Sequence, residues 1–166
     1  MTSRSPFDAE LAPVWPRLRR FAYSLARNPA DANDLAQMAA EKAFRSFGQY
    51  QDGTRFDSWL FRICRTVWID QMRARSRISA FEAPAEAGDG VGHDPRAATE
   101  AAIDLNRAMA AMQRLPQEQR EVVALILIDG FGYREAAEIL GQPIGTVSSR
   151  LVRGRQALLT MLGEGG

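Results

Sequence analysis

The sequence predicts an all-α protein made of two small helical domains joined by a flexible linker. Apolar residues recur at helical spacing on both sides of residues 81–100, a segment of acidic residues, prolines and glycines. No stretch alternates polar and apolar residues for long, as a half-buried strand would. We expect a first domain over residues 1–80, a linker over 81–100, and a second domain over 101–166 that contains a helix-turn-helix.

The composition limits the class of protein. The chain has 166 residues, 46% of them hydrophobic and 25% charged, which is enough apolar content to bury a core. No run approaches the roughly 18 apolar residues of a membrane span, and the N-terminus lacks the apolar stretch of a signal peptide. We therefore expect a cytoplasmic protein with no membrane insertion.

The scarcity of cysteine and histidine argues against several kinds of site. Cys64 and His93 are the only residues of their types. A disulfide framework is therefore excluded, and a metal site or a Cys-His nucleophile pair is not expected. Because no catalytic motif or phosphate-binding glycine loop occurs either, we expect no enzyme activity and no cofactor. Cys64 is predicted to be a small buried side chain.

Charge is distributed unevenly, although the net charge is only +1. Basic residues outnumber acidic ones over residues 1–80, acidic residues dominate 81–112, and the two balance over 113–166. Lys42 is the only lysine among the 21 basic residues. The planar guanidinium of arginine suits bidentate contacts to phosphates and bases, but a GC-rich coding bias would produce the same preference.

A helix is predicted to begin after Asn28 and Pro29, a favourable N-cap and first-turn pair. Acidic residues early in this helix and basic residues late in it match the helix dipole. A stable surface helix explains this pattern as well as a binding surface does. The residues that recur at helical spacing are Leu35, Met38, Ala39, Lys42 and Ala43.

A long helix is predicted to follow the Asp52-Gly53 turn, with Asp57 or Ser58 as its N-cap. One face reads as core and consists of Trp59, Leu60, Ile63 and Val67. A second stripe mixes aromatic and basic residues and consists of Phe61, Arg65, Trp68 and Met72. This stripe fits a groove that binds unstacked bases. It also fits a helix that is apolar on all sides because it lies in the middle of a bundle. For Trp68 we favour the buried position.

The second domain carries the clearest local pattern. Pro116 is predicted to open a helix, residues 133–140 form a short helix, and residues 141–143 break it before a last helix. A short helix, a tight turn with glycine and a second helix make a helix-turn-helix. The expected core residues of the three helices are Val122, Val123, Ile126 and Leu127; Ala136, Ala137 and Leu140; and Val147, Leu151, Gly154 and Leu158.

The other face of the last helix carries no carboxylate. Its residues are Thr146, Ser149, Val152, Arg153 and Gln156. A recognition helix needs such a face because it enters the major groove between two rows of phosphates. The sequence therefore predicts that this helix binds DNA.

Four segments resemble those of a known family: "DANDLAQ", "FDSWLFRICRTVWIDQMR", "LPQEQREVV" and "GYREAAEILGQPIGTVSSRLVRGRQAL". In this order they resemble extracytoplasmic-function (ECF) sigma factors, group IV of the bacterial sigma-70 type, over about residues 10–160. The resemblance implies a subunit that binds core RNA polymerase and directs initiation at promoters with minus-35 and minus-ten elements. It also implies a role in strand opening and control by an anti-sigma factor.

The resemblance also implies roles for particular residues. Those that would contact the clamp of the polymerase largest subunit are Asp34, Leu35, Gln37, Met38 and Lys42. Those that would bind the minus-ten element, with residues 48–57 holding a flipped base, are Arg55, Phe56, Arg62, Arg65, Thr66, Ile69, Arg73 and Arg77. Those that would read the minus-35 element are Thr146, Ser148, Ser149, Val152, Arg153 and Gln156. The resemblance also implies contact with the flap of core RNA polymerase.

Three positions depart from the family pattern. Met38 stands where the family commonly has Glu, Thr66 where many members have Asn, and Ser148 where Arg is frequent. These departures bear on polymerase affinity and promoter preference. Two other functions are considered: a sigma-fold mimic that sequesters an anti-sigma factor, and a helix-turn-helix repressor, which would leave the first domain without a role.

Overall fold

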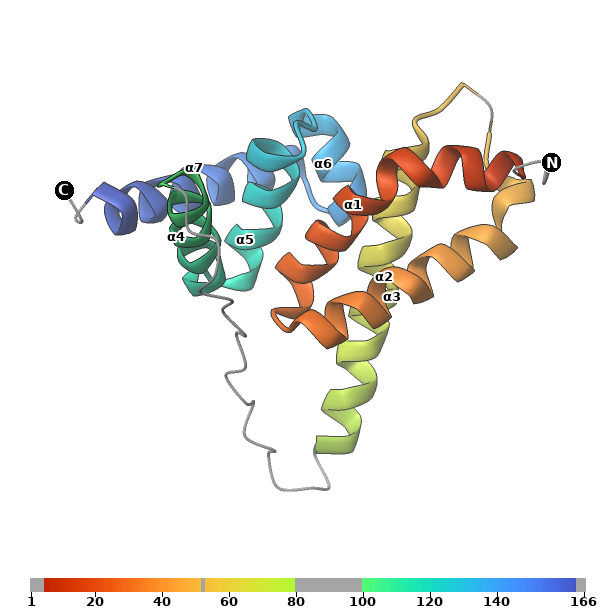
Figure 1. Cartoon of the computed structure of the whole chain (residues 1–166), viewed down its shortest axis with the longest axis horizontal. Coiled ribbons are helices and arrows are strands. Elements are labelled where there is room, and N and C mark those ends of the chain that lie inside the picture. Colours follow the sequence, from red (N-terminus) through yellow and green to blue (C-terminus); the bar gives the residue numbers. More distant parts are fainter. Residues whose placement is uncertain (1–4, 52, 80–99, 164–166) are drawn as a thin grey trace. The chain divides into compact units, whose positions relative to one another are not determined.

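A computed structural model of the chain describes residues 5–51, 53–79 and 100–163. The chain divides into two compact units at about residue 90. All regular secondary structure in the described ranges is helical, which confirms the predicted fold class (Figure 1). Residues 80–99, which include most of the predicted linker and His93, lie outside the described residues.

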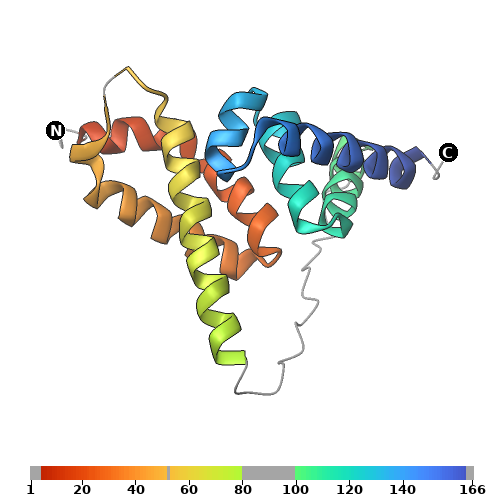
Figure 2. The ribbon, with the colours of Figure 1, turned by 180° about the vertical axis from the view of Figure 1, so that it is seen from behind.

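The described part of the first unit consists of three long helices and one short turn. They are α1 (Pro6–Ala26), α2 (Pro29–Arg45), the 3₁₀ turn η1 (Phe47–Gln49) and α3 (Phe56–Ser79). Each of the three long helices packs against the other two. Both ribbon views show the C-terminal part of α3 continuing beyond the ends of α1 and α2 (Figures 1 and 2).

Helix α1 has well-defined ends. The Ser5 hydroxyl accepts a hydrogen bond from the backbone N–H of Asp8 at 3.2 Å, which caps the N-terminus. Arg27 adopts a left-handed conformation, φ 64°, and its N–H donates to the carbonyl of Tyr23. Between these ends Leu18, Phe21 and Leu25 are buried, at the spacing of a helical face.

Helix α2 confirms the predicted start. The Asn28 side chain accepts hydrogen bonds from the backbone N–H groups of Ala30 and Asp31, at 2.9 and 3.3 Å. The residues of its inner face are small except for one leucine, so α1 and α3 approach it closely. They are Ala32, Leu35, Ala36, Ala39 and Ala43. Met38 and Lys42, which share the predicted stripe, are exposed instead.

Helix α3 begins earlier than predicted. The N–H of Trp59 donates to the carbonyl of Arg55, so the first helical residue is Phe56. Asp57 and Ser58 lie inside the first turn, and neither is the N-cap that the sequence predicted. The Asp57 carboxylate instead accepts hydrogen bonds from the side chains of Arg17 and Arg55.

The mixed stripe of α3 lies largely in the core. Phe61 and Trp68 are 0% and 4% exposed. The prediction of a buried Trp68 is confirmed, whereas a base-stacking role for these two rings is wrong because the bundle encloses them. Cys64 is also fully buried, as expected, and burial raises the pKa of its thiol to about 12. Of the predicted core face, Leu60 and Val67 are buried while Trp59 and Ile63 are only partly so.

The second unit begins with α4 (Glu100–Arg114) and α5 (Gln117–Val123), followed by the π-helical segment η2 (Ala124–Ile128). In the π-helical segment the N–H of Asp129 donates to the carbonyl of Ala124, five residues earlier. This wider turn changes the helical spacing. Leu127, predicted to be core, is therefore 50% exposed, and Leu125 is fully buried in its place.

The helix-turn-helix forms as predicted, with α6 (Tyr133–Leu140) and α7 (Ile144–Gly163). Gly141 ends α6 in the left-handed conformation, φ 61°, which glycine adopts without steric cost. The expected inner residues of α6 are buried, as are Val147, Leu151 and Gly154 of α7. Leu158 is half-buried. None of the described helices is long and apolar enough to cross a membrane.

Candidate nucleic-acid and polymerase interfaces

The outer face of α7 presents polar, basic and small apolar side chains. Ser149, Val152, Arg153 and Gln156 are exposed, Val152 to 62%. They lie opposite the buried Val147, Leu151 and Gly154, while Thr146 and Ser148 are half-buried at the edges of this face. The Ser149 hydroxyl donates to the carbonyl of Thr146 at 3.1 Å. The whole of α7 contains no acidic residue, so nothing on it repels a phosphate.

The outer face of α3 carries a basic stripe. Arg62, Thr66, Arg73 and Arg77 are exposed, and Arg65 and Ile69 are partly exposed. Steps of three and four residues place them on one face. The Thr66 hydroxyl donates to the carbonyl of Arg62 at 3.0 Å. Arg73 and Arg77 border a shallow hollow together with Asp70 and Ser76.

Phe56, predicted to bind the minus-ten element, is a core residue. Only 5% of it is exposed. Its ring meets those of Phe7, Phe47 and Tyr50 edge to face, with centroids 5.9, 6.3 and 5.5 Å apart. A side chain enclosed by other rings has no surface for DNA, so the predicted contact is wrong. Phe56 instead anchors the start of α3 against α1 and η1.

Asp57 brings together two arginines that are far apart in the sequence. Its Oδ2 accepts hydrogen bonds from Nη1 of Arg17 at 3.0 Å and Nη2 of Arg55 at 2.8 Å. Its Oδ1 accepts from Nε of Arg55 at 3.1 Å and from the backbone N–H of Ser58 at 2.8 Å. Burial acts to raise the pKa of Asp57, but the hydrogen bonds from Arg55, Arg17 and Ser58 outweigh it and lower that pKa.

Sequence reasoning did not identify Arg17 and assigned a different role to Asp57. Nothing in a single sequence links positions 17 and 57, because the pair forms only when α1 packs against α3. The one available signal was an acidic residue within an otherwise apolar run, which also fits a helix N-cap.

The outer face of α2 carries the predicted polymerase contacts, with one exception. Asp34, Gln37, Met38 and Lys42 are exposed. Leu35 is only 1% exposed and belongs to the core, so its predicted contact with polymerase is wrong. Met38 is tied to α3, because its sulfur accepts a hydrogen bond from Nε2 of Gln71 at 3.0 Å.

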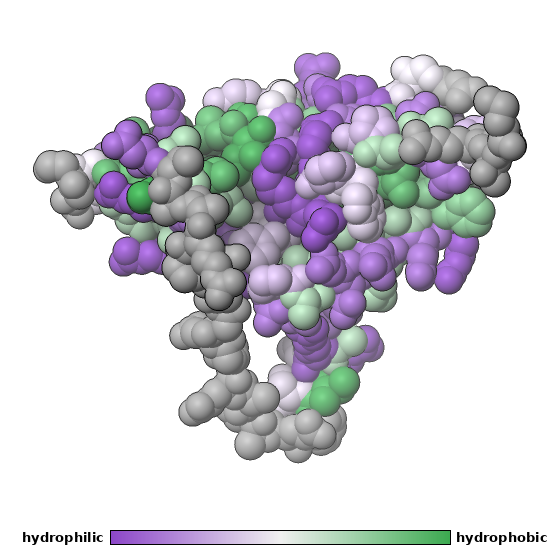
Figure 3. All heavy atoms as spheres, in the orientation of Figure 1, coloured by the Kyte–Doolittle hydropathy of each residue, from purple (hydrophilic) through white to green (hydrophobic). Residues whose placement is uncertain are grey.

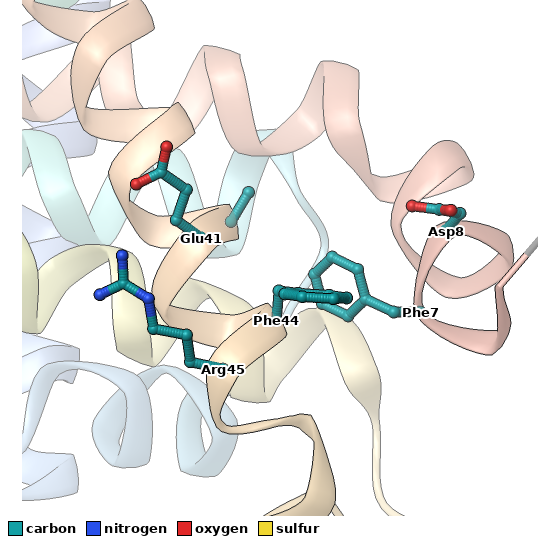
Figure 4. Close-up of a pocket in the computed structure, with 6 residues that line it drawn as sticks. Phe7, Asp8, Glu41, Phe44 and Arg45 are labelled. Carbon is teal, nitrogen blue, oxygen red and sulfur yellow. The ribbon is translucent and has the colours of Figure 1, made fainter.

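A shallow apolar hollow lies between the N-terminal end of α1 and the C-terminal end of α2. Phe44 stands in it 61% exposed, with its ring edge to face with that of Phe7 at 5.3 Å (Figure 4). Asp8, Glu41 and Arg45 also line it. No pattern in the sequence indicated this hollow. The visible face of the molecule is mainly hydrophilic, with several separate apolar areas (Figure 3).

Comparison with known proteins identifies both units. Residues 14–78 match the family model of sigma-70 region 2, and residues 105–158 match that of sigma-70, region 4. These matches cover the basic stripe of α3 and the helix-turn-helix respectively. The chain is therefore a sigma-70-type factor.

Individual relatives show to which family of sigma-70-type factors the chain belongs. The chain is 38% identical over 153 residues to ECF RNA polymerase sigma factor SigE of Mycolicibacterium smegmatis, covering 89% of this chain and 58% of the relative. It is 35% identical over 155 residues to ECF RNA polymerase sigma factor EcfG of Rhodopseudomonas palustris, covering 93% and 83%. The protein belongs to the ECF family of RNA polymerase sigma factors.

A solved structure agrees with this assignment. The sigma factor RpoE from Bartonella quintana, in complex with the anti-sigma factor NepR, superimposes with a TM-score of 0.84 and 34% sequence identity. The match covers 95% of this chain and 96% of that one. The chain is therefore similar in fold to a sigma factor whose structure was solved with an anti-sigma factor.

Proposed function

We propose that this chain binds core RNA polymerase and directs initiation at promoters that carry minus-35 and minus-ten elements. Residues 1–80 supply polymerase and minus-ten binding, residues 101–166 supply minus-35 binding, and residues 81–100 link the two. Membership of the ECF sigma factors supports this assignment.

The observation that carries the proposal is the outer face of α7. Val152 and Arg153 are exposed at its centre, the helix has no carboxylate, and a glycine turn connects it to α6. An exposed arginine on such a helix makes bidentate contacts to guanine, and a small apolar side chain contacts a thymine methyl group. Thr146, Ser148, Ser149 and Gln156 complete the minus-35 surface.

The basic stripe of α3 is proposed to bind the melted minus-ten element. Arg62, Arg65, Thr66, Ile69, Arg73 and Arg77 form one continuous face. A positively charged face that runs along a helix suits the backbone of a single strand, because each arginine neutralises a phosphate. Arg55 extends this surface at the start of the helix.

The outer face of α2 is proposed to bind the clamp of the polymerase largest subunit through Asp34, Gln37, Met38 and Lys42. These side chains are exposed while the opposite face of α2 is packed, so a partner reaches them without unfolding the unit. A second contact, between the second unit and the polymerase flap, would hold the two units in register on the promoter.

Polymerase supplies the chemistry in this proposal, and the chain itself performs none. It acts in the cytoplasm, where polymerase and promoters are found. We also infer that an anti-sigma factor controls it, since the similar B. quintana factor is solved in complex with NepR. A partner that covers the α2 face or the α7 face would prevent initiation.

Run-off transcription with core polymerase and a genomic promoter library tests the proposal. Core polymerase with this chain is expected to produce transcripts from a set of promoters that share two sequence elements. Core polymerase alone is the control. A chain that binds an anti-sigma factor but supports no transcription is a sigma-fold mimic, and one that binds duplex operators without polymerase is a repressor; either result contradicts the proposal.

A further inference from the structure

We propose that Arg17 and Asp57 are positioning residues for minus-ten recognition. Helix α1 contributes no predicted DNA contact, yet through Asp57 it holds Arg55, and with it the end of the loop before α3, in a set conformation before DNA arrives. This inference rests on the proposed function of the α3 face.

The first support is the geometry around Asp57. Its side chain is 11% exposed, and both oxygens are used: Arg55 binds them as a bidentate pair and Arg17 adds a third guanidinium contact. Paired hydrogen bonds between charged groups fix the orientation of the guanidinium plane as well as its position. The Arg55 side chain remains 52% exposed, so it is oriented and still accessible to a ligand.

The second support is that Arg17 is itself held firmly. Its guanidinium carbon lies 5.5 Å from the ring centroid of Phe61, a cation–π arrangement. Phe61 stacks on Phe21 of α1, with centroids 4.9 Å apart and the rings nearly parallel. The buried rings of Phe21 and Phe61 therefore hold Arg17 in position, and Arg17 in turn binds Asp57. Helix α1 contributes both Phe21 and Arg17 to this network.

The third support is the other end of the loop. The Tyr50 hydroxyl donates to the carbonyl of Thr54, and the Thr54 hydroxyl donates to the carbonyl of Gln51 at 2.7 Å. The Tyr50 ring stacks on Phe47 at 5.8 Å and also contacts Trp59. The loop is thus tied at both ends, by aromatic rings at Tyr50 and by the Asp57 ion pairs at Arg55.

Such a network reduces the entropy that DNA binding must remove, because the long side chain of Arg55 is already ordered. It also has a distinctive electrostatic signature. Asp57 removes one unit of positive charge from a surface that binds phosphates, so its loss should increase non-specific attraction while it decreases specific recognition. Loss of the charge alone would increase non-specific attraction without a decrease in specific recognition.

The experiment uses holoenzyme assembled from core polymerase and the full chain. Its probes are a single-stranded non-template oligonucleotide with the minus-ten sequence found by the transcription assay, and a scrambled oligonucleotide. The variants are Asp57→Asn, which keeps the side-chain shape, Arg17→Gln, and Arg17→Lys, which keeps the charge. Asp31→Asn is the matched control, because it removes the same charge from an exposed ion pair of the same unit, with Arg75 at 3.9 Å.

Asp57→Asn and Arg17→Gln are expected to lower the preference for the minus-ten oligonucleotide by roughly 3- to 10-fold, the cost of ordering one such side chain on binding. Asp57→Asn should also bind the scrambled oligonucleotide more tightly and with a steeper salt dependence. Arg17→Lys should restore part of the preference. Asp31→Asn should leave the preference unchanged, although it changes the net charge equally.

Polymerase affinity and the melting temperature of each variant separate positioning from folding. The inference is overturned if Asp57→Asn keeps the wild-type preference. It is also overturned if the preference falls only in proportion to polymerase affinity, since that result indicates a general loss of structure. If wild-type holoenzyme itself does not distinguish the two oligonucleotides, the proposed function of the α3 face fails, and this inference fails with it.

Discussion

Gly154 of α7 lies directly against Val123 of α5. A Cβ atom at position 154 would stand 2.9 Å from Cγ2 of Val123 and 3.3 Å from Cβ of Gln119, closer than side chains normally approach. The recognition helix is therefore seated on α5 at a point where only glycine fits. The orientation of the DNA-binding face depends on this contact.

Gly154→Ala should destabilise the second unit. Overpacking a tight contact typically costs about 1–3 kcal/mol, more than the higher helix propensity of alanine returns. Gly145→Ala is the control, because it lies on the same helix with nothing within 4 Å of the added Cβ. Thermal unfolding followed by circular dichroism measures both variants. Equal stability of the two would show that α7 shifts without cost.

Arg153→Ala should lose minus-35 recognition without loss of stability. A bidentate arginine contact contributes about 1–3 kcal/mol of discrimination between base pairs. The side chain is exposed, whereas Leu151 on the opposite face is 6% exposed, and Leu151→Ala should cost roughly 2–5 kcal/mol of folding stability. Run-off transcription and urea unfolding of both variants separate the two effects. Unchanged transcription by Arg153→Ala, or unfolding of its second unit, would contradict the assignment.

The free chain should bind duplex promoter DNA only weakly. Its net charge is +1, so few phosphates are neutralised unless polymerase holds the two units in register. At physiological salt we expect a dissociation constant in the range of non-specific binding, on the order of 10⁻⁶ to 10⁻⁴ M. Fluorescence anisotropy with and without core polymerase measures it. Tight, sequence-specific binding by the free chain would instead indicate a repressor.

Asp57→Asn should change the pH dependence of stability at low pH. The folded-state pKa of Asp57 is lowered, so the ionised carboxylate stabilises the fold above its ordinary pKa of 3.8, and this contribution is lost as the pH falls through the lowered value. At pH 7 the substitution should cost about 1.5–3 kcal/mol, the contribution of hydrogen bonds to a charged group. Urea unfolding at pH 7, 5, 4 and 3 should show the difference from wild type shrinking below about pH 4. A constant difference would show that the ion pairs contribute nothing.

The helix-turn-helix could be predicted in detail because its signals are local. The bounds of α6 agree with the prediction, and the inner residues of α6 and α7 follow the helical period. Gly141 ends the first helix because it adopts a left-handed φ, which is unfavourable for other residues. The Asn28 cap of α2 is equally local.

Predictions failed where the helical spacing changed, or where the element that packs against a residue is distant from it in the sequence. Leu127 is exposed because the π-helical segment alters the spacing on which its prediction depended. Leu35 and Phe56 were assigned to binding surfaces by resemblance, but both side chains are buried in the core of the first unit. For Leu35 and Phe56 the deciding factor was packing between elements, and for Leu127 it was the change of helical spacing.

By itself, the sequence determined the class of fold, the ends of the helices with strong caps or glycine turns, and the carboxylate-free face of α7. These depend on backbone preferences and on periodicity, which act over a few residues. Only the tertiary structure decided that Arg17 and Arg55 share the carboxylate of Asp57, and that Gly154 meets Val123. Such contacts join residues that are neighbours in space alone, and they arise when the buried faces of the helices pack together to remove apolar surface from water.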